Sequence, residues 1–168
     1  MKITDTHVFF YGNADVFSNF HHSPFIIGGK RFTCSEQWIM YQKAILFGDH
    51  ATAYQIMKSS NPSTFKSLGR RVKNFNDIIW WEKRELLTFV GLLEKFRQNP
   101  ALAKELEDTK DRTLVEASPW DRVWGVGLSE SDPRILDPTN WQGDNLLGKI
   151  LMKVRLQIRN DFQSKLAI

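Results

Sequence analysis

The spacing of apolar and polar positions along the chain predicts a domain built mostly from helices. Apolar residues recur every three or four positions in two long stretches, one from Asn76 or Asp77 to about Gln98 and one from Asp144 or Asn145 onward. Such spacing places the apolar side chains on one helix face, where they can pack against a core. Shorter helices are expected over residues 36–47, 51–58, 62–68 and 99–109.

Four shorter segments have the composition of strands or extended chain. Residues 7–11 are β-branched and aromatic and end at a Gly-Asn pair, and residues 25–32 read as a hairpin because Gly28 and Gly29 suit a two-residue turn. Residues 114–117 and 123–126 are also expected to be extended, whereas residues 128–141 contain two prolines and read as a loop. We therefore predict a mostly helical α+β fold with a few short antiparallel strands.

Composition indicates one domain. The chain has 168 residues, of which 42% are hydrophobic and 25% charged, and no segment rich in Gly, Pro or Ser divides it. A chain of this length can bury roughly 70% of its unfolded surface around a single core. We expect a single domain over residues 1–168. The net charge of +4 suits an anionic ligand but is too weak to indicate duplex DNA binding by itself.

Cysteine and histidine usage excludes several classes of site. Cys34 is the single cysteine, so the chain forms no internal disulfide, and a reducing compartment fits best. The first residues lack the apolar core of a signal peptide, and no apolar run approaches the roughly 18 residues of a membrane span. The four histidines lack the spacing of a helical zinc site. We expect a cytoplasmic protein without metal or cofactor.

The first candidate site lies on the helix predicted after Ser35, which is expected to be its N-cap. Glu36, Met40 and Lys43 fall on one face of that helix, and Glu36 and Lys43 are about two turns, roughly 10 Å, apart. This distance matches the separation of a ribose anomeric carbon from an attached phosphate. A solvated pair of surface charges is the alternative, and the spacing alone favours it.

Further candidates lie in aromatic and glycine-rich segments. Residues 114–127 combine two acids, two tryptophans and Gly125 and Gly127 in a short irregular stretch, although either acid could pair with Arg122. Trp80 and Trp81 open a long helix, where one should face the core. The segment 143–148 begins the last helix, whose free N–H groups suit a phosphate or an ordinary N-cap equally well. Four basic residues of that helix read as a solvated face: Lys149, Lys153, Arg155 and Arg159.

Taken in order, these pieces resemble the NADAR family, which includes the riboflavin-intermediate N-glycosidases. The matching pieces cover roughly residues 8–158 and comprise Phe10-Tyr11, Phe17-Ser18-Asn19-Phe20, Ser35-Glu36-Gln37, Gln42-Lys43-Ala44, Leu68-Gly69-Arg70, Trp80, Lys95-Phe96, Asn99-Pro100, Leu114–Pro119, Asp121, Trp124–Gly127, Trp141–Gly143, Asn145–Gly148, Leu151-Met152 and Arg155. The sequence departs from the pattern modestly, with Gln37 where some members have His and Cys34 where a small residue or Thr is common.

The resemblance implies a small α+β hydrolase that cleaves ribose–nitrogen bonds. The known substrates of that family are phosphoribosylamino-pyrimidine intermediates of riboflavin synthesis and ADP-ribose attached to guanine in DNA or RNA. The family's important acids match Glu36 and Asp121, and its important tryptophan matches Trp80. The substrate-binding positions implied are Lys43, Arg70, Phe20, Asn19, Trp124, Gly125 and Asn145.

These residues suggest a mechanism. Cleavage of a ribose–nitrogen bond develops positive charge at the anomeric carbon, and O-glycosidases meet the same need with two carboxylates. We expect Glu36 and Asp121 to share those duties, Trp80 to stack on base or sugar, and Lys43 and Arg70 to hold phosphate. The competing hypothesis is a non-catalytic module that binds ADP-ribose or a nucleotide, and this function would not require both acids.

Overall fold

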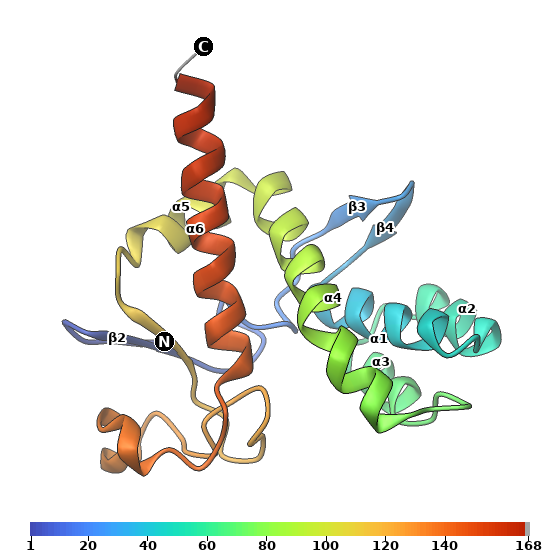
Figure 1. Ribbon diagram of the computed structural model, residues 1–168, viewed down its shortest axis with the longest axis horizontal. Helices are drawn as coiled ribbons and strands as arrows, with labels where there is room; N and C mark the ends of the chain where they lie inside the picture. Colours follow the sequence, from blue (N-terminus) through green and yellow to red (C-terminus); the bar gives the residue numbers. More distant parts are fainter. Residues whose placement is uncertain (167–168) are drawn as a thin grey trace. The chain divides into compact units, whose positions relative to one another are not determined.

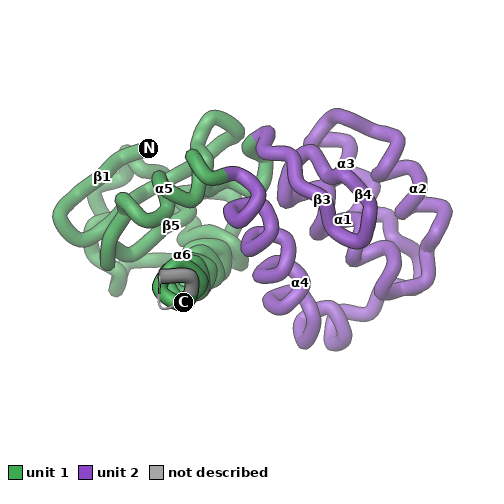
Figure 2. The backbone as a smooth tube through the Cα atoms, turned by 90° about the horizontal axis from the view of Figure 1, so that it is seen from above, with its two compact units in different colours: residues 1–21, 100–168 green, residues 22–99 purple. Residues whose placement is uncertain are grey.

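The computed structural model describes the chain from residue 1 to residue 166. The described chain forms two compact units, one made of residues 22–99 and the other of residues 1–21 together with the chain from residue 100 onward (Figure 2). The structure confirms the predicted α+β class, since helices dominate and the strands are short (Figure 1). No helix within residues 1–166 is long and apolar enough to cross a bilayer.

The unit of residues 22–99 contains a hairpin and four helices. Strands β3 (Phe25–Ile27) and β4 (Lys30–Phe32) pair antiparallel, and α1 (Ser35–Leu46), α2 (His50–Lys58), α3 (Pro62–Gly69) and α4 (Asp77–Gln98) follow. Gly28 and Gly29 take positive φ values of 57° and 73°, as the predicted turn requires. Helix α1 lies at the centre of this unit, because it packs against α2, α3 and α4.

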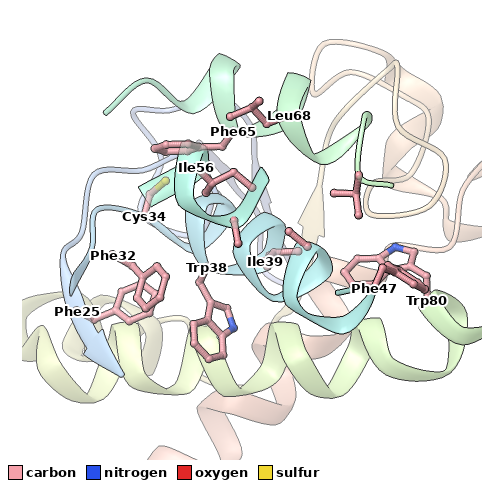
Figure 3. Close-up of a cluster of buried hydrophobic side chains, with 13 residues drawn as sticks. Phe25, Phe32, Cys34, Trp38, Ile39, Phe47, Ile56, Phe65, Leu68 and Trp80 are labelled. Atoms are coloured by element: carbon pink, nitrogen blue, oxygen red, sulfur yellow. The ribbon is translucent and has the colours of Figure 1, made fainter. Parts of the chain in front are cut away.

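The core of this unit is aromatic and aliphatic (Figure 3). Fully buried side chains come from the hairpin (Phe32), from α1 (Ile39), from α2 (Ile56) and from α3 (Phe65). Trp38 donates its indole N–H to the Leu87 carbonyl of α4 over 2.7 Å, which satisfies the one polar atom of a buried ring. This packing fixes α1, the helix of the first candidate site.

Side-chain caps explain where three of the helices begin. Asp49, Asn61 and Asn76 accept hydrogen bonds from the first-turn amides of α2, α3 and α4 respectively. The expectation that Ser35 caps α1 is wrong. The cap position belongs to Cys34, whose side chain makes no cap bond, and Ser35 is the first helical residue, buried in the core.

The other unit joins the two ends of the described chain. Strands β1 (Lys2–Ile3), β2 (His7–Phe10) and β5 (Thr113–Glu116) form a sheet in the order β1-β2-β5. Helix α5 (Pro100–Asp108) precedes β5, and α6 (Leu146–Leu166) packs against both β5 and α5. The loop between β5 and α6 contains two short 3-10 turns, η1 (Pro133–Leu136) and η2 (Pro138–Asn140).

Two strand predictions need correction. Strands β2 and β5 pair in parallel, with Val8 opposite Leu114, and not antiparallel. Residues 123–126 form no strand, because the Asp121 carboxylate accepts the amide hydrogens of Val123 and Trp124 and bends the chain there. The segment is a loop held by side-chain bonds.

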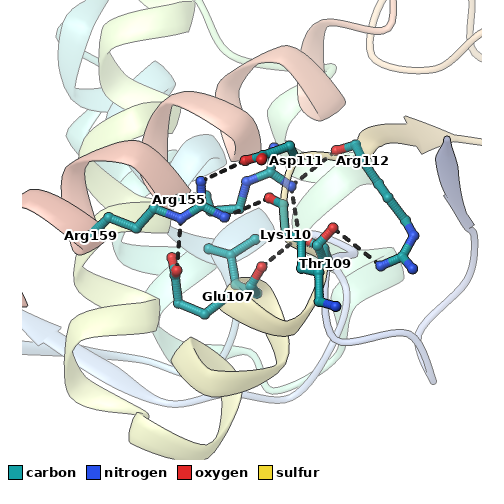
Figure 4. A network of polar contacts seen from close by, with 8 residues as sticks. Glu107, Thr109, Lys110, Asp111, Arg112, Arg155 and Arg159 are labelled. Atoms are coloured by element: carbon teal, nitrogen blue, oxygen red, sulfur yellow. Dashed lines mark hydrogen bonds and ion pairs between the residues drawn. The ribbon is translucent and has the colours of Figure 1, made fainter. Parts of the chain in front are cut away.

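The prediction of a solvated basic face on α6 is confirmed for Lys149 and Lys153, which are exposed, and is wrong for Arg155 and Arg159 (Figure 4). Arg155 is 6% exposed and donates to the Thr109 hydroxyl and the Arg112 carbonyl over 2.7 and 3.0 Å. Arg159 pairs with Glu107 and Asp111 over 2.8 and 2.9 Å. These two arginines tie α6 to the α5–β5 connection, so they stabilise the fold.

Candidate active site

Glu36 lies in the first turn of α1 and is buried, with 7% of its surface exposed. Its neighbour Gln37 accepts the Thr33 amide hydrogen over 2.8 Å and donates to the Ile56 carbonyl over 3.1 Å. These bonds fix the start of α1 to the end of the hairpin and to α2. The Glu36 backbone is therefore held rigidly, and the alternative of a solvated surface acid is wrong.

Lys43 lies two turns further along α1 and is half-buried. Its ammonium nitrogen lies 4.1 Å from the centre of the Phe75 ring and 5.5 Å from the centre of the Trp80 ring. Burial lowers the pKa of Lys43 below its usual value, while the carboxylates of Asp77 and Glu36 act in the opposite direction. Lys43 and Glu36 therefore belong to one electrostatic environment.

Trp80 faces the core, as predicted for one of the two adjacent tryptophans. Only 9% of Trp80 is exposed, against 56% of Trp81, whose ring lies 3.5 Å from the Arg84 guanidinium carbon. The Asn76 side chain accepts the Ile79 amide hydrogen over 3.1 Å and fixes the first turn of α4, from which Trp80 projects. Trp80 is thus a ring held in a defined position beside Lys43.

Arg70 lies directly after α3 and is exposed. Its amide donates to the Lys66 carbonyl and closes the last turn of that helix. The preceding Gly69 packs against Met40 of α1 so closely that an added Cβ would lie 2.0 Å from the Met40 sulfur. The backbone of Arg70 is therefore anchored, while its guanidinium faces solvent.

The remaining predicted site residues lie in the other unit. Asp121 uses Oδ1 to accept the amide hydrogens of Val123 and Trp124 over 3.0 and 2.8 Å. Gly125 packs against this loop, since a Cβ there would lie 2.8 Å from the Glu116 carbonyl oxygen. Gly125 is required for close packing of the chain against itself.

Asn145 holds the start of α6 against β5. Its Oδ1 accepts the Glu116 amide hydrogen over 3.0 Å, and its Nδ2 donates to the Leu114 carbonyl over 2.8 Å. The amides of Leu146 and Leu147 donate to loop carbonyls over 3.1 Å. Of the two alternatives for this helix start, these bonds favour an ordinary structural role over phosphate binding.

Asn19 and Phe20 follow β2 in a turn. Asn19 is 7% exposed, and its Oδ1 has no hydrogen-bond partner among residues 1–166. The Phe20 amide donates to the Ser18 hydroxyl over 3.2 Å. A buried carbonyl oxygen without a donor is costly, so Asn19 is suited to accept a hydrogen bond from a ligand.

The structure thus brings Glu36, Lys43 and Trp80 together within one unit and places Asp121, Trp124, Gly125, Asn145, Asn19 and Phe20 in the other. Sequence reasoning missed Phe75 and Asp77, both of which act on Lys43. Their position next to the predicted cap Asn76 is the one available signal. In the part of the chain that the structure describes, no cluster of three His, Cys, Asp or Glu could hold a metal ion.

The fold and these residues define an α+β protein that keeps a carboxylate and an ammonium out of bulk water on one helix. The chain belongs to the NADAR domain family, whose family model matches residues 9–159. The matched residues run from β2 into α6 and include every predicted site residue.

Similar proteins support the assignment. The chain is 40% identical to Protein irg-1 of Caenorhabditis elegans over 179 residues, covering 96% of this chain and 84% of that protein. It is also 40% identical to N-glycosidase R617 of Acanthamoeba polyphaga mimivirus over 163 residues, covering 90% and 96%. The NMR structure of the E. coli protein YbiA superposes with a TM-score of 0.78 at 28% identity and covers 96% of this chain and 90% of that one.

Proposed function

We propose that this chain is an N-glycosidase, a hydrolase that cleaves the bond between ribose and a base or amino nitrogen. The observation that supports the proposal most is the placement of buried Glu36 and half-buried Lys43 on one helix, α1, with Lys43 beside the ring of Trp80. A relative that is 40% identical over nearly its whole length carries the name N-glycosidase. Family membership and site chemistry therefore agree.

The chemistry follows from the charge that develops during cleavage. As the ribose–nitrogen bond breaks, the anomeric carbon becomes positive, and a nearby carboxylate stabilises that charge or activates water. Glu36 is our candidate for this role, because its backbone is fixed and its side chain is removed from solvent. Trp80 offers an aromatic face to the base or sugar.

Phosphate recognition falls to Lys43 and Arg70. The Lys43 ammonium is partly desolvated, and this strengthens its attraction to an anion. Arg70 is exposed at the end of α3 and offers a fork of donors suited to phosphate oxygens. These two cations suit a phosphorylated riboside.

Asp121 is our candidate for the second carboxylate. Its Oδ1 already accepts two loop amide hydrogens, so a catalytic role would rest on Oδ2. Asn19 Oδ1 remains a candidate acceptor for a ligand hydroxyl. Trp124, Gly125, Phe20 and Asn145 are the other proposed substrate positions. The side chain of Asn145 already makes two hydrogen bonds to β5.

Two substrate classes fit this site. One is a phosphoribosylamino-pyrimidine, the small intermediate implied by the family resemblance. The other is ADP-ribose attached to guanine in DNA or RNA, which the net charge of +4 would help to attract. Both present a ribose–nitrogen bond and at least one phosphate, and we propose that the reaction takes place in the cytoplasm.

The test supplies both substrates to the purified protein in parallel and follows sugar release by mass spectrometry. Release from the pyrimidine alone identifies a metabolite-clearing N-glycosidase, and release from the oligonucleotide alone identifies an enzyme that removes ADP-ribose from nucleic acid. Binding of one or both substrates with release from neither contradicts the proposal and favours a non-catalytic binding module.

A further inference from the structure

The turn between α1 and α2 contains a buried carboxylate to which the proposed reaction gives no role. Asp49 is 6% exposed, and its Oδ1 accepts the Thr52 amide hydrogen over 3.0 Å, which caps α2. Its Oδ2 accepts two more hydrogens, from the Thr52 hydroxyl over 2.7 Å and from the Lys73 amide over 2.9 Å. The bond from Lys73 is the largest cause that lowers the pKa of Asp49.

The bond to Lys73 reaches a different part of the unit. Lys73 lies in the connection between α3 and α4, where Val72 is buried in the core and Asn74 takes a left-handed conformation with φ of 55°. Asp49 therefore ties the α1–α2 turn to this connection by a bond that spans 24 residues of sequence. A charged acceptor makes such a bond stronger than a neutral one.

The connection between α3 and α4, which Asp49 holds, leads into the two aromatic rings that lie near Lys43. Phe75 follows Asn74, and its ring lies 5.2 Å from the Phe47 ring and 4.1 Å from the Lys43 ammonium. The next residue caps α4, and Trp80 projects from the first turn of that helix. Movement of the connection would therefore move both rings that lie against Lys43.

We propose that Asp49 is a positioning residue, whose bond to the Lys73 amide holds Phe75 and Trp80 against Lys43. The assignment deepens the proposed function and rests on it for its kinetic consequences, but the geometry can be tested without turnover. Thr52 provides the contrast, because its hydroxyl bonds to the same carboxylate and does not reach the α3–α4 connection.

Lys43 itself reports whether the rings remain in place. The charged groups that act on it are Glu36 from its own helix and Asp77 from the start of α4, while desolvation is the largest influence. If the connection loosens, water reaches the ammonium and the pKa of Lys43 rises toward the ordinary lysine value. Loss of contact with Asp77 would act in the opposite direction, but it is the smaller influence.

Two substitutions weaken or remove the bond to the Lys73 amide. In Asp49→Asn an amide nitrogen, which cannot accept, replaces one carboxylate oxygen and the other oxygen becomes a neutral acceptor, so the bond to Lys73 is either lost or weaker than the charged one. In Asp49→Ser the hydroxyl can still cap α2 but is too short to serve Lys73 as well. Thr52→Val is the matched control, since it removes one bond to the same carboxylate and leaves both backbone bonds.

The experiment measures the pKa of Lys43 by NMR on protein with ¹³C-labelled lysine, together with KM and kcat for a phosphorylated riboside. We expect Asp49→Asn and Asp49→Ser to raise the pKa of Lys43 and to lower kcat/KM by about tenfold or more. Thr52→Val should leave the pKa of Lys43 unchanged and kcat/KM within about twofold of the parent value.

The proposal is overturned if the Asp49 variants and Thr52→Val give the same Lys43 pKa as the parent protein. Asp49→Ser decides the matter if Asn at this position prevents folding, because Ser preserves the helix cap. If the parent protein cleaves neither substrate, the proposed function fails, whereas the comparison of Lys43 pKa values still decides the role of Asp49.

Discussion

The ammonium of Lys43 lies 5.5 Å from the centre of the Trp80 ring, which links the last turns of α1 to the first turn of α4. An aromatic face at this distance attracts a cation. Burial of the lysine lowers its pKa below the usual value. The site therefore combines a flat apolar surface with a half-buried positive charge, which suits the phosphorylated riboside that we propose as the substrate.

Replacing Lys43 by Ala should weaken the binding of phosphorylated substrates. A bond between ammonium and phosphate contributes roughly 1.5–3 kcal/mol, so we expect KM to rise by about tenfold or more. Steady-state kinetics on a phosphorylated riboside and on its phosphate-free counterpart measure the effect. The matched control is Lys83→Ala, which removes an exposed lysine from α4. An equal loss on both ribosides would refute a phosphate-binding role.

Replacing Asn145 by Ala should destabilise the fold. The change removes two hydrogen bonds to β5 and forces alanine into a backbone conformation with φ of 52°. We expect the free energy of unfolding to fall by about 2–4 kcal/mol in urea titrations. Asn145→Gly, which tolerates this φ, should recover part of the loss. Unchanged stability together with a raised KM would instead assign Asn145 to direct substrate contact.

Lys95 should make stability depend on pH. It is fully buried, and desolvation lowers its pKa to about 7 in the folded protein. The unfolded chain has a lysine pKa near 10.4, so between about pH 7 and 10 the unfolded state binds more protons and this residue contributes stability as pH rises. The slope should approach 1.4 kcal/mol per pH unit.

Denaturant titrations of the parent protein and of Lys95→Met between pH 7 and 10 measure this dependence. The parent should gain stability relative to the variant as the pH rises, because methionine does not titrate. Two parallel stability curves would show that Lys95 keeps its ordinary pKa in the folded protein.

The helices and the hairpin turn were predictable from the sequence because they begin or end at residues with a strong preference for capping a helix or forming a turn. Asn76 caps α4 as expected, and Gly28 and Gly29 make the predicted hairpin turn. The parallel pairing of β2 with β5 was not predictable in this way, because it joins segments about a hundred residues apart. Pairing over such a separation depends on the whole fold.

The candidate site shows the same division. The sequence placed Glu36 and Lys43 on one helix face, but helical spacing says nothing about burial, and the spacing alone favoured a solvated pair. Their environment depends on Phe75 and Trp80, which arrive from α4 and the connection before it. Asn145 illustrates a second limit, because residues that suit a phosphate at a helix start also suit an ordinary structural role.

The most direct test of the proposed function is the single-turnover rate of ribose–nitrogen bond cleavage by the parent protein and by Glu36→Gln, with substrate binding measured in parallel. Glu82→Gln, an exposed acid on α4, is the matched control. We predict that Glu36→Gln folds and binds the substrate but cleaves it at least about a hundredfold more slowly, while Glu82→Gln cleaves at the parent rate. Cleavage by Glu36→Gln at the parent rate would contradict the role that we assign to this helix.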